Sequence, residues 1–228
     1  MNKKFGMILA IASTLGMMAF AADREAKVQD RLTAATDTLT DMMNASDHGI
    51  PHDLLDKAKC IVVIPGMKKA GFIIGAKYGS GFASCRSAGG AWSAPAAMSV
   101  QGGSVGFQIG ASDTDVVIIV MNDKGMDHLL QDKFTLGGEG SIAAGPVGRT
   151  ASAETDAMMH AEMLSYSRSR GLFAGVSLEG ATLHKDADAD RELYGRDVNS
   201  REILTGTVQP PAGASAFESA LKQDAGRH

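Results

Sequence analysis

The sequence predicts an α+β fold: a single domain with a strongly curved, Gly-rich, mainly antiparallel sheet, flanked by an N-terminal amphipathic helix and by short C-terminal helices. Two patterns predict it. Apolar residues recur at helical spacing between residues 23 and 46, and β-branched runs interrupted by glycine fill much of residues 60–121. With 44% hydrophobic and 21% charged residues in 228, the chain has an ordinary globular composition and is long enough to bury a core.

Residues 1–22 have the pattern of a signal peptide. Lys3 and Lys4 precede an uncharged, mostly apolar run, and the small residues Ala19, Ala21 and Ala22 close it. We therefore expect cleavage on export and a periplasmic or secreted mature protein. The alternative is an uncleaved membrane anchor, although the run is short for a bilayer-spanning helix, which needs ~20 apolar residues.

Residues 23–50 are predicted to form the amphipathic helix, because Val28, Leu32, Leu39 and their neighbours lie three or four positions apart. Gly49 and Pro51 end it, and a short helix follows over 51–59.

The main domain is predicted to span residues 51–205. The apolar run 60–64 reads as a buried strand that ends at the turn pair Pro65-Gly66. Further strands are predicted at 71–78, 79–86, 92–110, 116–121, 161–167 and 172–183, with helices near 123–130, 192–194 and 200–205. Residues 206–228 are predicted to be an extended C-terminal tail with one short helix over 215–222.

Cys60 and Cys85 both fall in predicted strands, 25 positions apart. An oxidising compartment would permit a disulfide, worth roughly 3 kcal/mol for a loop of that length. Two buried free thiols are the alternative, since the sequence does not give their separation in space.

Catalytic and metal-binding patterns fail on inspection. His48 and His52 are four apart, but Gly49 and Pro51 break the helix that such a metal pair needs. Asp186, Asp188 and Asp190 imitate the start of a calcium loop, but Arg191 stands where that loop needs glycine, so we predict a solvated acidic turn that caps a helix. We expect no enzyme, no metal and no cofactor. The formal net charge of −4 argues against a nucleic-acid surface.

Basic and aromatic residues suggest a different kind of site. A basic turn beside an aromatic ring can meet a phosphate headgroup and its apolar border together. The lipid-contact candidates are Lys68, Lys69, Phe72, Lys77, Tyr78 and Arg86, and the second basic candidates are Arg168 and Arg170. The alternative is a solvated hairpin turn.

Ordered segments between Leu54 and Gly195 resemble the SYLF domain family. They include 70–79 (AGFIIGAKYG), 102–110 (GGSVGFQIG), 145–149 (GPVGR) and 171–180 (GLFAGVSLEG). The resemblance implies a single α/β unit that binds phospholipid, with phosphoinositides and actin filaments as partners of eukaryotic members.

Together these observations lead to the hypothesis of a non-enzymatic phospholipid-binding module of the bacterial cell envelope. Its expected partner is an anionic phospholipid or another envelope amphiphile, bound peripherally. No nucleic-acid partner is expected, actin is expected to be unlikely for an exported chain, and the oligomeric state is not predicted. The alternative is a structural or protein-interaction domain of the envelope without lipid affinity, and a hydrolase would need a Ser–His hydrogen bond.

Overall fold

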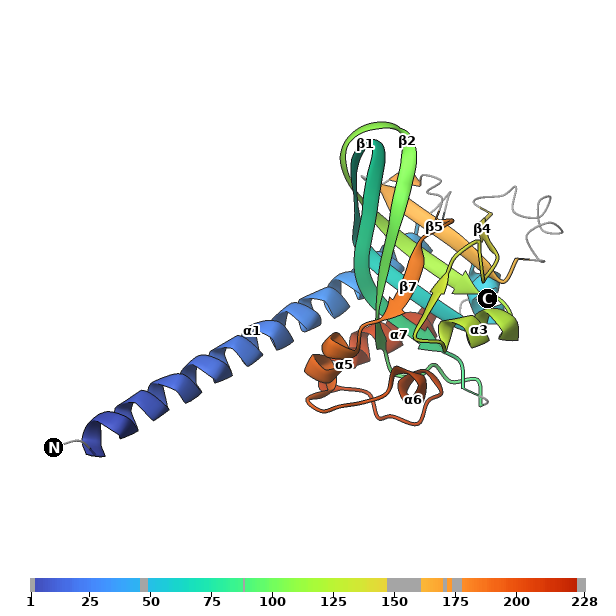
Figure 1. Ribbon diagram of the computed structural model, residues 1–228. Coiled ribbons are helices and arrows are strands. Elements are labelled where there is room, and N and C mark those ends of the chain that lie inside the picture. The colour runs from blue at the N-terminus through green and yellow to red at the C-terminus, as the bar shows by residue number, and fades with distance from the viewer. Residues whose placement is uncertain are drawn as a thin grey trace.

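A computed structural model describes residues 3–45, 49–87, 89–146, 161–169, 172–173 and 178–224 of the chain. It confirms the predicted α+β class, with helices packed around a curled, mainly antiparallel sheet (Figure 1). In these residues no helix combines the length and the hydropathy that crossing a membrane requires.

The N-terminal helix carries the apolar stripe that the sequence predicts. Helix α1 (Lys3–Met43) is continuous, so it begins within the predicted signal peptide rather than at residue 23. The stripe of Val28, Leu32, Ala35, Leu39 and Met42 is buried along its whole length. Helix α2 (His52–Lys57) follows, with Pro51 at its N-cap.

Two very long strands replace the five short ones predicted between residues 60 and 121. Strand β1 (Cys60–Cys85) pairs antiparallel with β2 (Ala96–Val120) along nearly its full length. The prediction that Pro65-Gly66 ends the first strand is wrong. The register shifts between Ile64 and Met67, and Gly66 takes a positive φ of 54°, so a bulge absorbs both turn residues and the strand continues.

The β1–β2 ribbon folds back on itself, so each long strand serves two arms of the sheet (Figure 1). In the first arm, β2 residues 115–120 pair with β5 (Met163–Ser169), which also pairs with β4 (Ile142–Ala144) and β6 (Leu172–Phe173). In the second arm, β2 residues 98–101 pair with β7 (Thr182–Lys185), and β7 pairs with β3 (Lys133–Thr135). Among the strands that the structure describes, β4 and β5 are the one parallel pair. The prediction of a strand over 172–183 is wrong in part. Residues 172–173 and 182–183 are strand, 178–181 form a turn with Gly180 at a positive φ of 73°, and 174–177 lie outside the described residues.

Glycine allows the two arms of β1 to cross closely. A Cβ atom on Gly81 would lie 1.9 Å from the carbonyl oxygen of Val63, and one on Gly79 would lie 2.6 Å from Cγ2 of Ile64. Any larger residue at Gly81 would therefore collide with backbone. This close approach accounts for part of the glycine content of the strands.

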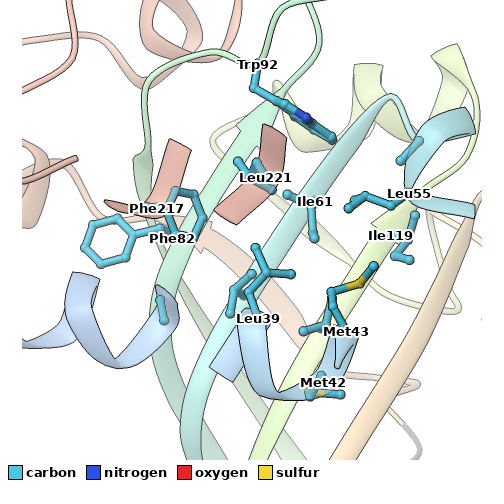
Figure 2. Close-up of a cluster of buried hydrophobic side chains, with 14 of the residues drawn as sticks. Leu39, Met42, Met43, Leu55, Ile61, Phe82, Trp92, Ile119, Phe217 and Leu221 are labelled. Atoms are coloured by element: carbon cyan, nitrogen blue, oxygen red, sulfur yellow. The ribbon is translucent and has the colours of Figure 1, made fainter. Parts of the chain in front are cut away.

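The bent ribbon separates two apolar cores. The inner core lies between the arms and contains Val62, Ile64 and Met67 with Phe134 and Leu183. The outer core lies between the sheet and the helices, and Figure 2 shows it with residues from α1, the two long strands and the C-terminal helix. Because side chains alternate along a strand, neighbouring residues such as Val62 and Val63 belong to different cores.

A disulfide joins Cys60 to Cys85, which decides the alternative left open by the sequence. The bond links the two ends of β1, so that the strand and its disulfide form a closed ring at the base of the ribbon. Both cysteines are fully buried in the inner core.

The remaining helices close the base of the structure. They are α3 (Asp123–Leu129), α5 (Ala187–Tyr194), α6 (Ser200–Leu204), the 3-10 turn η2 (Ala212–Ala214) and α7 (Ser215–Asp224). The predicted tail helix is confirmed as α7. Its Phe217 and Leu221 are fully buried in the outer core with residues of α1, so the tail contributes to the core rather than only extending from it.

Candidate functional site

Five of the six lipid-contact candidates lie on the single strand β1. Lys68 and Lys69 are on its first arm, and Lys77 and Tyr78 are on its second arm. The fifth, Phe72, is a strand residue near the bend, and its side chain is outside the described part of the structure. The alternative reading of Lys68 and Lys69 as a hairpin turn is wrong, because both are paired strand residues, opposite Asp113 and Ser112.

Strand alternation divides these residues between two faces. Lys68 points outward, where its Nζ lies 3.2 Å from Oδ1 of Asp113. This ion pair is largely exposed, so it contributes at most about 1 kcal/mol to stability. Tyr78 also points outward, and 53% of its surface is exposed.

Lys69 and Lys77 belong to the inward face, at the distal end of the inner core. Lys77 is only 6% exposed. Burial, and secondarily the positive charge of Lys69, lower the pKa of Lys77, whereas the negative charge of Glu179 acts in the opposite direction. A lysine in this position is poorly placed to reach a flat membrane surface.

Arg86 is separated from the other candidates at the base of β1. Its guanidinium lies 4.4 Å from the ring centre of Trp92 and donates hydrogen bonds to the carbonyl oxygens of Gly90 and Leu55. These contacts hold the connection between β1 and β2 against α2.

The second basic pair divides in a similar way. Arg168 donates hydrogen bonds to Asp41 at 3.0 Å and to Asp115 at 3.2 Å, so it fastens α1 to the sheet. Arg170 lies outside the described residues. Among the basic candidates that the structure describes, the side chains are therefore not gathered into one patch.

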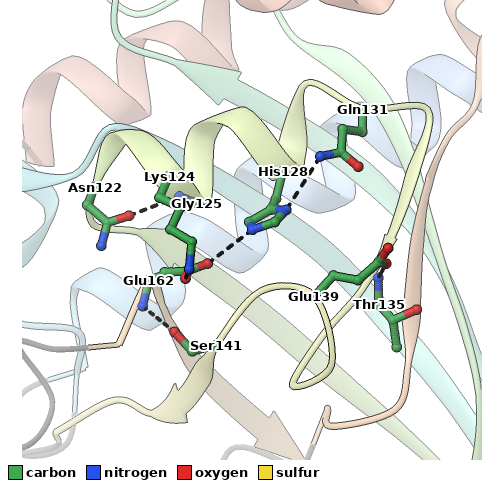
Figure 3. A network of polar contacts seen from close by, with 9 residues as sticks. All are labelled: Asn122, Lys124, Gly125, His128, Gln131, Thr135, Glu139, Ser141 and Glu162. Carbon is green, nitrogen blue, oxygen red and sulfur yellow. Dashed lines mark hydrogen bonds and ion pairs between the residues drawn. The ribbon is translucent and has the colours of Figure 1, made fainter.

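A polar network at the start of β5 has no counterpart in the sequence analysis (Figure 3). Oε1 of Glu162 lies 2.6 Å from Nζ of Lys124, and Oε2 lies 3.5 Å from Nε2 of His128. The backbone N–H of Glu162 donates to Ser141 Oγ, and the ring of His128 stacks on Phe134. The network ties α3 to β5. Sequence reasoning missed it because His128 and Glu162 are far apart in the chain and carry no local motif.

Asp190 is the second polar residue whose role the sequence hid. It was predicted to lie in a solvated acidic turn, but it is fully buried, and it accepts hydrogen bonds from the N–H of Ala97 and from Ser200 Oγ, both at 2.7 Å. Burial raises its pKa to about 6, against the opposing effect of these two hydrogen bonds. Asp186 does cap α5 as predicted, by accepting from the N–H of Ala189. In the described residues, no three His, Cys, Asp or Glu side chains come together as metal ligands would.

The strand register forms a broad surface around Tyr78 that no sequence pattern indicated. Tyr78 of β1, Gln101 of β2, Thr182 of β7 and Thr135 of β3 stand side by side in one row across the second arm. We call the outward side of this arm the open face. Its residues are Ala76, Tyr78, Ser80, Ser99, Gln101, Gly103, Lys133, Thr135, Thr182 and His184.

Comparison with known proteins identifies the family of this fold. The family model described as "Ysc84: Las17-binding protein actin regulator" matches residues 101–224, which is more than half of the chain. The chain belongs to the Ysc84 family. This confirms the SYLF resemblance. The match covers β2 from Gln101 onward, the strands that follow β2, and the C-terminal helices, and it begins after α1 and β1.

Curated relatives of the Ysc84 family member described here include proteins of fungi and animals. An SH3 domain-containing protein of Schizosaccharomyces pombe is 44% identical over 175 residues, which is 75% of this chain and 40% of the relative. SH3 domain-containing YSC84-like protein 1 of Mus musculus is 37% identical over 85% of this chain and 55% of its own length. LAS seventeen-binding protein 3 of Saccharomyces cerevisiae is 36% identical over 79% and 40% respectively. The chain thus spans about half the length of these relatives.

The expectation of an anionic phospholipid partner, with actin unlikely, is wrong. The family description and the relatives' names refer to actin regulation and to Las17 binding. The structure offers a physical reason for the error. The basic residues that motivated the lipid hypothesis are dispersed, because Lys77 is buried, Arg86 stacks on Trp92, and Arg168 is held by two carboxylates.

Proposed function

We propose that this chain is a non-enzymatic module that binds a protein partner, with the actin-binding property that the description of its family suggests. The observation that carries the proposal is the Ysc84 match over residues 101–224, which covers most of β2, the strands that follow it and the helices from α3 to α7. The proposal assigns no catalytic role to any residue.

The distal part of the β1–β2 ribbon is the proposed contact region. In Figure 1 the ribbon extends beyond the base helices α5 and α7. Among the residues whose side chains are described, Tyr78 is the one large hydrophobic side chain that is exposed, and it lies on this part of the ribbon. A large aromatic side chain left in water on a projecting element is a feature of protein-binding surfaces.

Co-sedimentation with actin filaments tests the proposal. The purified chain is centrifuged with and without filaments, and its flotation with phosphatidylserine-containing liposomes is measured in parallel. We expect saturable pelleting that depends on filaments, and no flotation. Flotation with liposomes in the absence of pelleting would overturn the proposal, as would the absence of any pelleting.

We propose separately that residues 1–22 are a signal peptide that is removed on export. The buried Cys60–Cys85 disulfide supports this, because disulfides persist in oxidising compartments and are rare in the cytosol. An exported chain would meet its partner outside the cytosol, so the filament assay measures the binding property and not the cellular partner. N-terminal sequencing of the mature protein tests the cleavage, and an N-terminus that begins at Met1 or Asn2 would refute it.

A further inference from the structure

The open face is a sheet surface that the described helices leave uncovered beyond its base, where Ser99 is still buried. At the base, Phe82 of β1 and Ala97 of β2 face outward and are fully buried under the helices. Tyr78 lies four residues before Phe82 in β1, a distance of about 13 Å at the usual rise per residue. It faces the same way and is exposed. The helix cover therefore ends between these two positions.

The inner side of the same arm shows that this outward orientation is fixed. Between the open-face residues lie Val100, Leu183 and Phe134, which are buried in the inner core. A one-residue slip in register would place these apolar side chains in water. The open face is therefore held rigidly, as the outer side of a sheet that is anchored from within.

The chemistry of the open face is neutral. Lys133 is the one lysine among its ten residues, which include no arginine, aspartate or glutamate, and it lies on β3 at the edge of the arm. The rest are small, hydroxyl, amide or imidazole residues around one aromatic ring. The cores of protein–protein interfaces have this character, since they are enriched in tyrosine and depleted of charged residues.

Tyr78 is also prepared for contact. Its hydroxyl lies 3.0 Å from Oγ of Ser80, two residues away on the same face, so the ring is held in one orientation. A tyrosine fixed in advance loses little conformational entropy on binding. Neighbours such as Ala76 and Gly103 are themselves exposed and too small to shield the ring, and around a bound partner they can help to exclude water from the contact.

We propose that the open face is the docking surface for the protein partner, with Tyr78 as its anchor. The proposal rests on the proposed function and names the surface that performs it. It commits to a partner whose matching surface is uncharged and offers an apolar hollow to the tyrosine ring. Ribbon lysines have no part in it, because Lys68 faces outward from the other arm beside Asp113, and Lys77 is buried.

A neutral interface predicts a weak dependence on salt. Screening acts on charge pairs, so affinity carried by Tyr78 and its neutral neighbours should change less than about threefold between low and high salt. Affinity carried by lysines would fall steeply over the same range. Salt titration thus separates the open face from a basic contact without any mutation.

The decisive experiment repeats filament co-sedimentation with four variants of the full chain. Tyr78→Ala removes the anchor, and Gln101→Arg places a charge beside it. Lys68→Ala is the matched control on the other arm, and Lys57→Ala is a control on α2. We expect the first two variants to bind about tenfold more weakly or worse, as at interface hot spots, and the controls to stay within about threefold of the wild type. Thermal melting confirms folding, which Tyr78→Ala should not disturb because the side chain is exposed.

Each other outcome decides against the inference. Wild-type pelleting that Tyr78→Ala and Gln101→Arg leave unchanged would overturn the docking surface and leave the proposed function standing. No wild-type pelleting would overturn both. A larger loss in Lys68→Ala, or a steep salt dependence, would assign binding to charge. A wild-type dimer on size-exclusion chromatography that Tyr78→Ala dissolves would show that a second copy of this chain occupies the face.

Discussion

Replacing Asp190 by asparagine tests how the buried carboxyl group links the helices at the base to the sheet. The carboxyl group accepts from the N–H of Ala97 and from the hydroxyl of Ser200. Asparagine has nearly the same shape and can keep both bonds, by accepting from Ala97 through its oxygen and donating to Ser200 through its amide. The substitution therefore removes the charge while preserving the geometry.

The sign of the pH effect follows from the direction of the shift. The pKa of Asp190 is raised from 3.8 to about 6 in the folded protein, so between pH 4 and 6 the folded state binds more protons than the unfolded state. The contribution of this group to stability is thus fully present below pH 4 and is lost as the pH rises through 6. The difference in pKa corresponds to about 3 kcal/mol.

Urea unfolding of the wild type and Asp190→Asn at several pH values between 4 and 8 measures this contribution. We expect the two proteins to match near pH 4 and the variant to be more stable by as much as about 3 kcal/mol at pH 7. Taking the difference between the two proteins cancels the titration of the other carboxylates. Asp127→Asn, at an exposed position on α3, is the matched control for the loss of one carboxylate.

A difference between Asp190→Asn and the wild type that stays constant from pH 4 to 8 would refute the linkage. A variant that loses stability relative to the wild type as the pH rises would refute its sign. Asp190→Ala separates charge from hydrogen bonding, because it also removes the carboxyl group but leaves the two donors unsatisfied, so it should be about 1–3 kcal/mol less stable than Asp190→Asn at every pH.

Three further changes address the ribbon and the outer core. Gly81→Ala should destabilise the protein by about 3 kcal/mol or more in urea unfolding, because its Cβ would meet backbone. In the control Gly103→Ala the Cβ enters open space, and stability should change by less than about 0.5 kcal/mol. Equal effects of the two substitutions would refute the close crossing of the two arms. Replacing Cys60 and Cys85 together by serine should cost about 3 kcal/mol, and an unchanged thermal midpoint would refute the stabilising role of the ring. Phe217→Ala should cost about 3–5 kcal/mol, and a loss below about 1 kcal/mol would show that α7 is dispensable for the outer core.

The sequence predicted well the elements that are determined by local periodicity. Leu32 and Leu39 lie at helical spacing, and the stripe they mark is the buried side of α1. The capping pattern that begins at Ser215 marked α7 correctly. In both cases a few neighbouring residues carry the whole signal.

The same reasoning failed where a local pattern competes with long-range pairing. Pro65 and Gly66 normally signal a turn, but 21 paired positions between β1 and β2 favour a continuous strand with a bulge. The candidate site suffered in a similar way. Lys77 and Tyr78 are adjacent in sequence and were grouped, yet strand alternation sends one inward and the other into solvent.

The open face depends on information that a single segment does not contain. Tyr78 and Gln101 become neighbours only through the register of β1 and β2, and Thr182 joins them only because β7 pairs with the other edge of β2. No spacing rule relates these three positions. Glu162 and His128 were missed for the same reason.

Because the Cys60–Cys85 bond closes β1 into a covalent ring, a single chain cut between these residues would not release the strand. The two pieces of β1 would both remain attached at the base of the ribbon, beside the inner core, because the disulfide joins them there. A pulling force applied through a bound partner at the distal ribbon would likewise be shared by both roots of β1, so that the strand could not be peeled away from one end alone. Reduction of the disulfide would open the ring, and β1 would then be an ordinary edge strand that force can separate from β2 starting at one end.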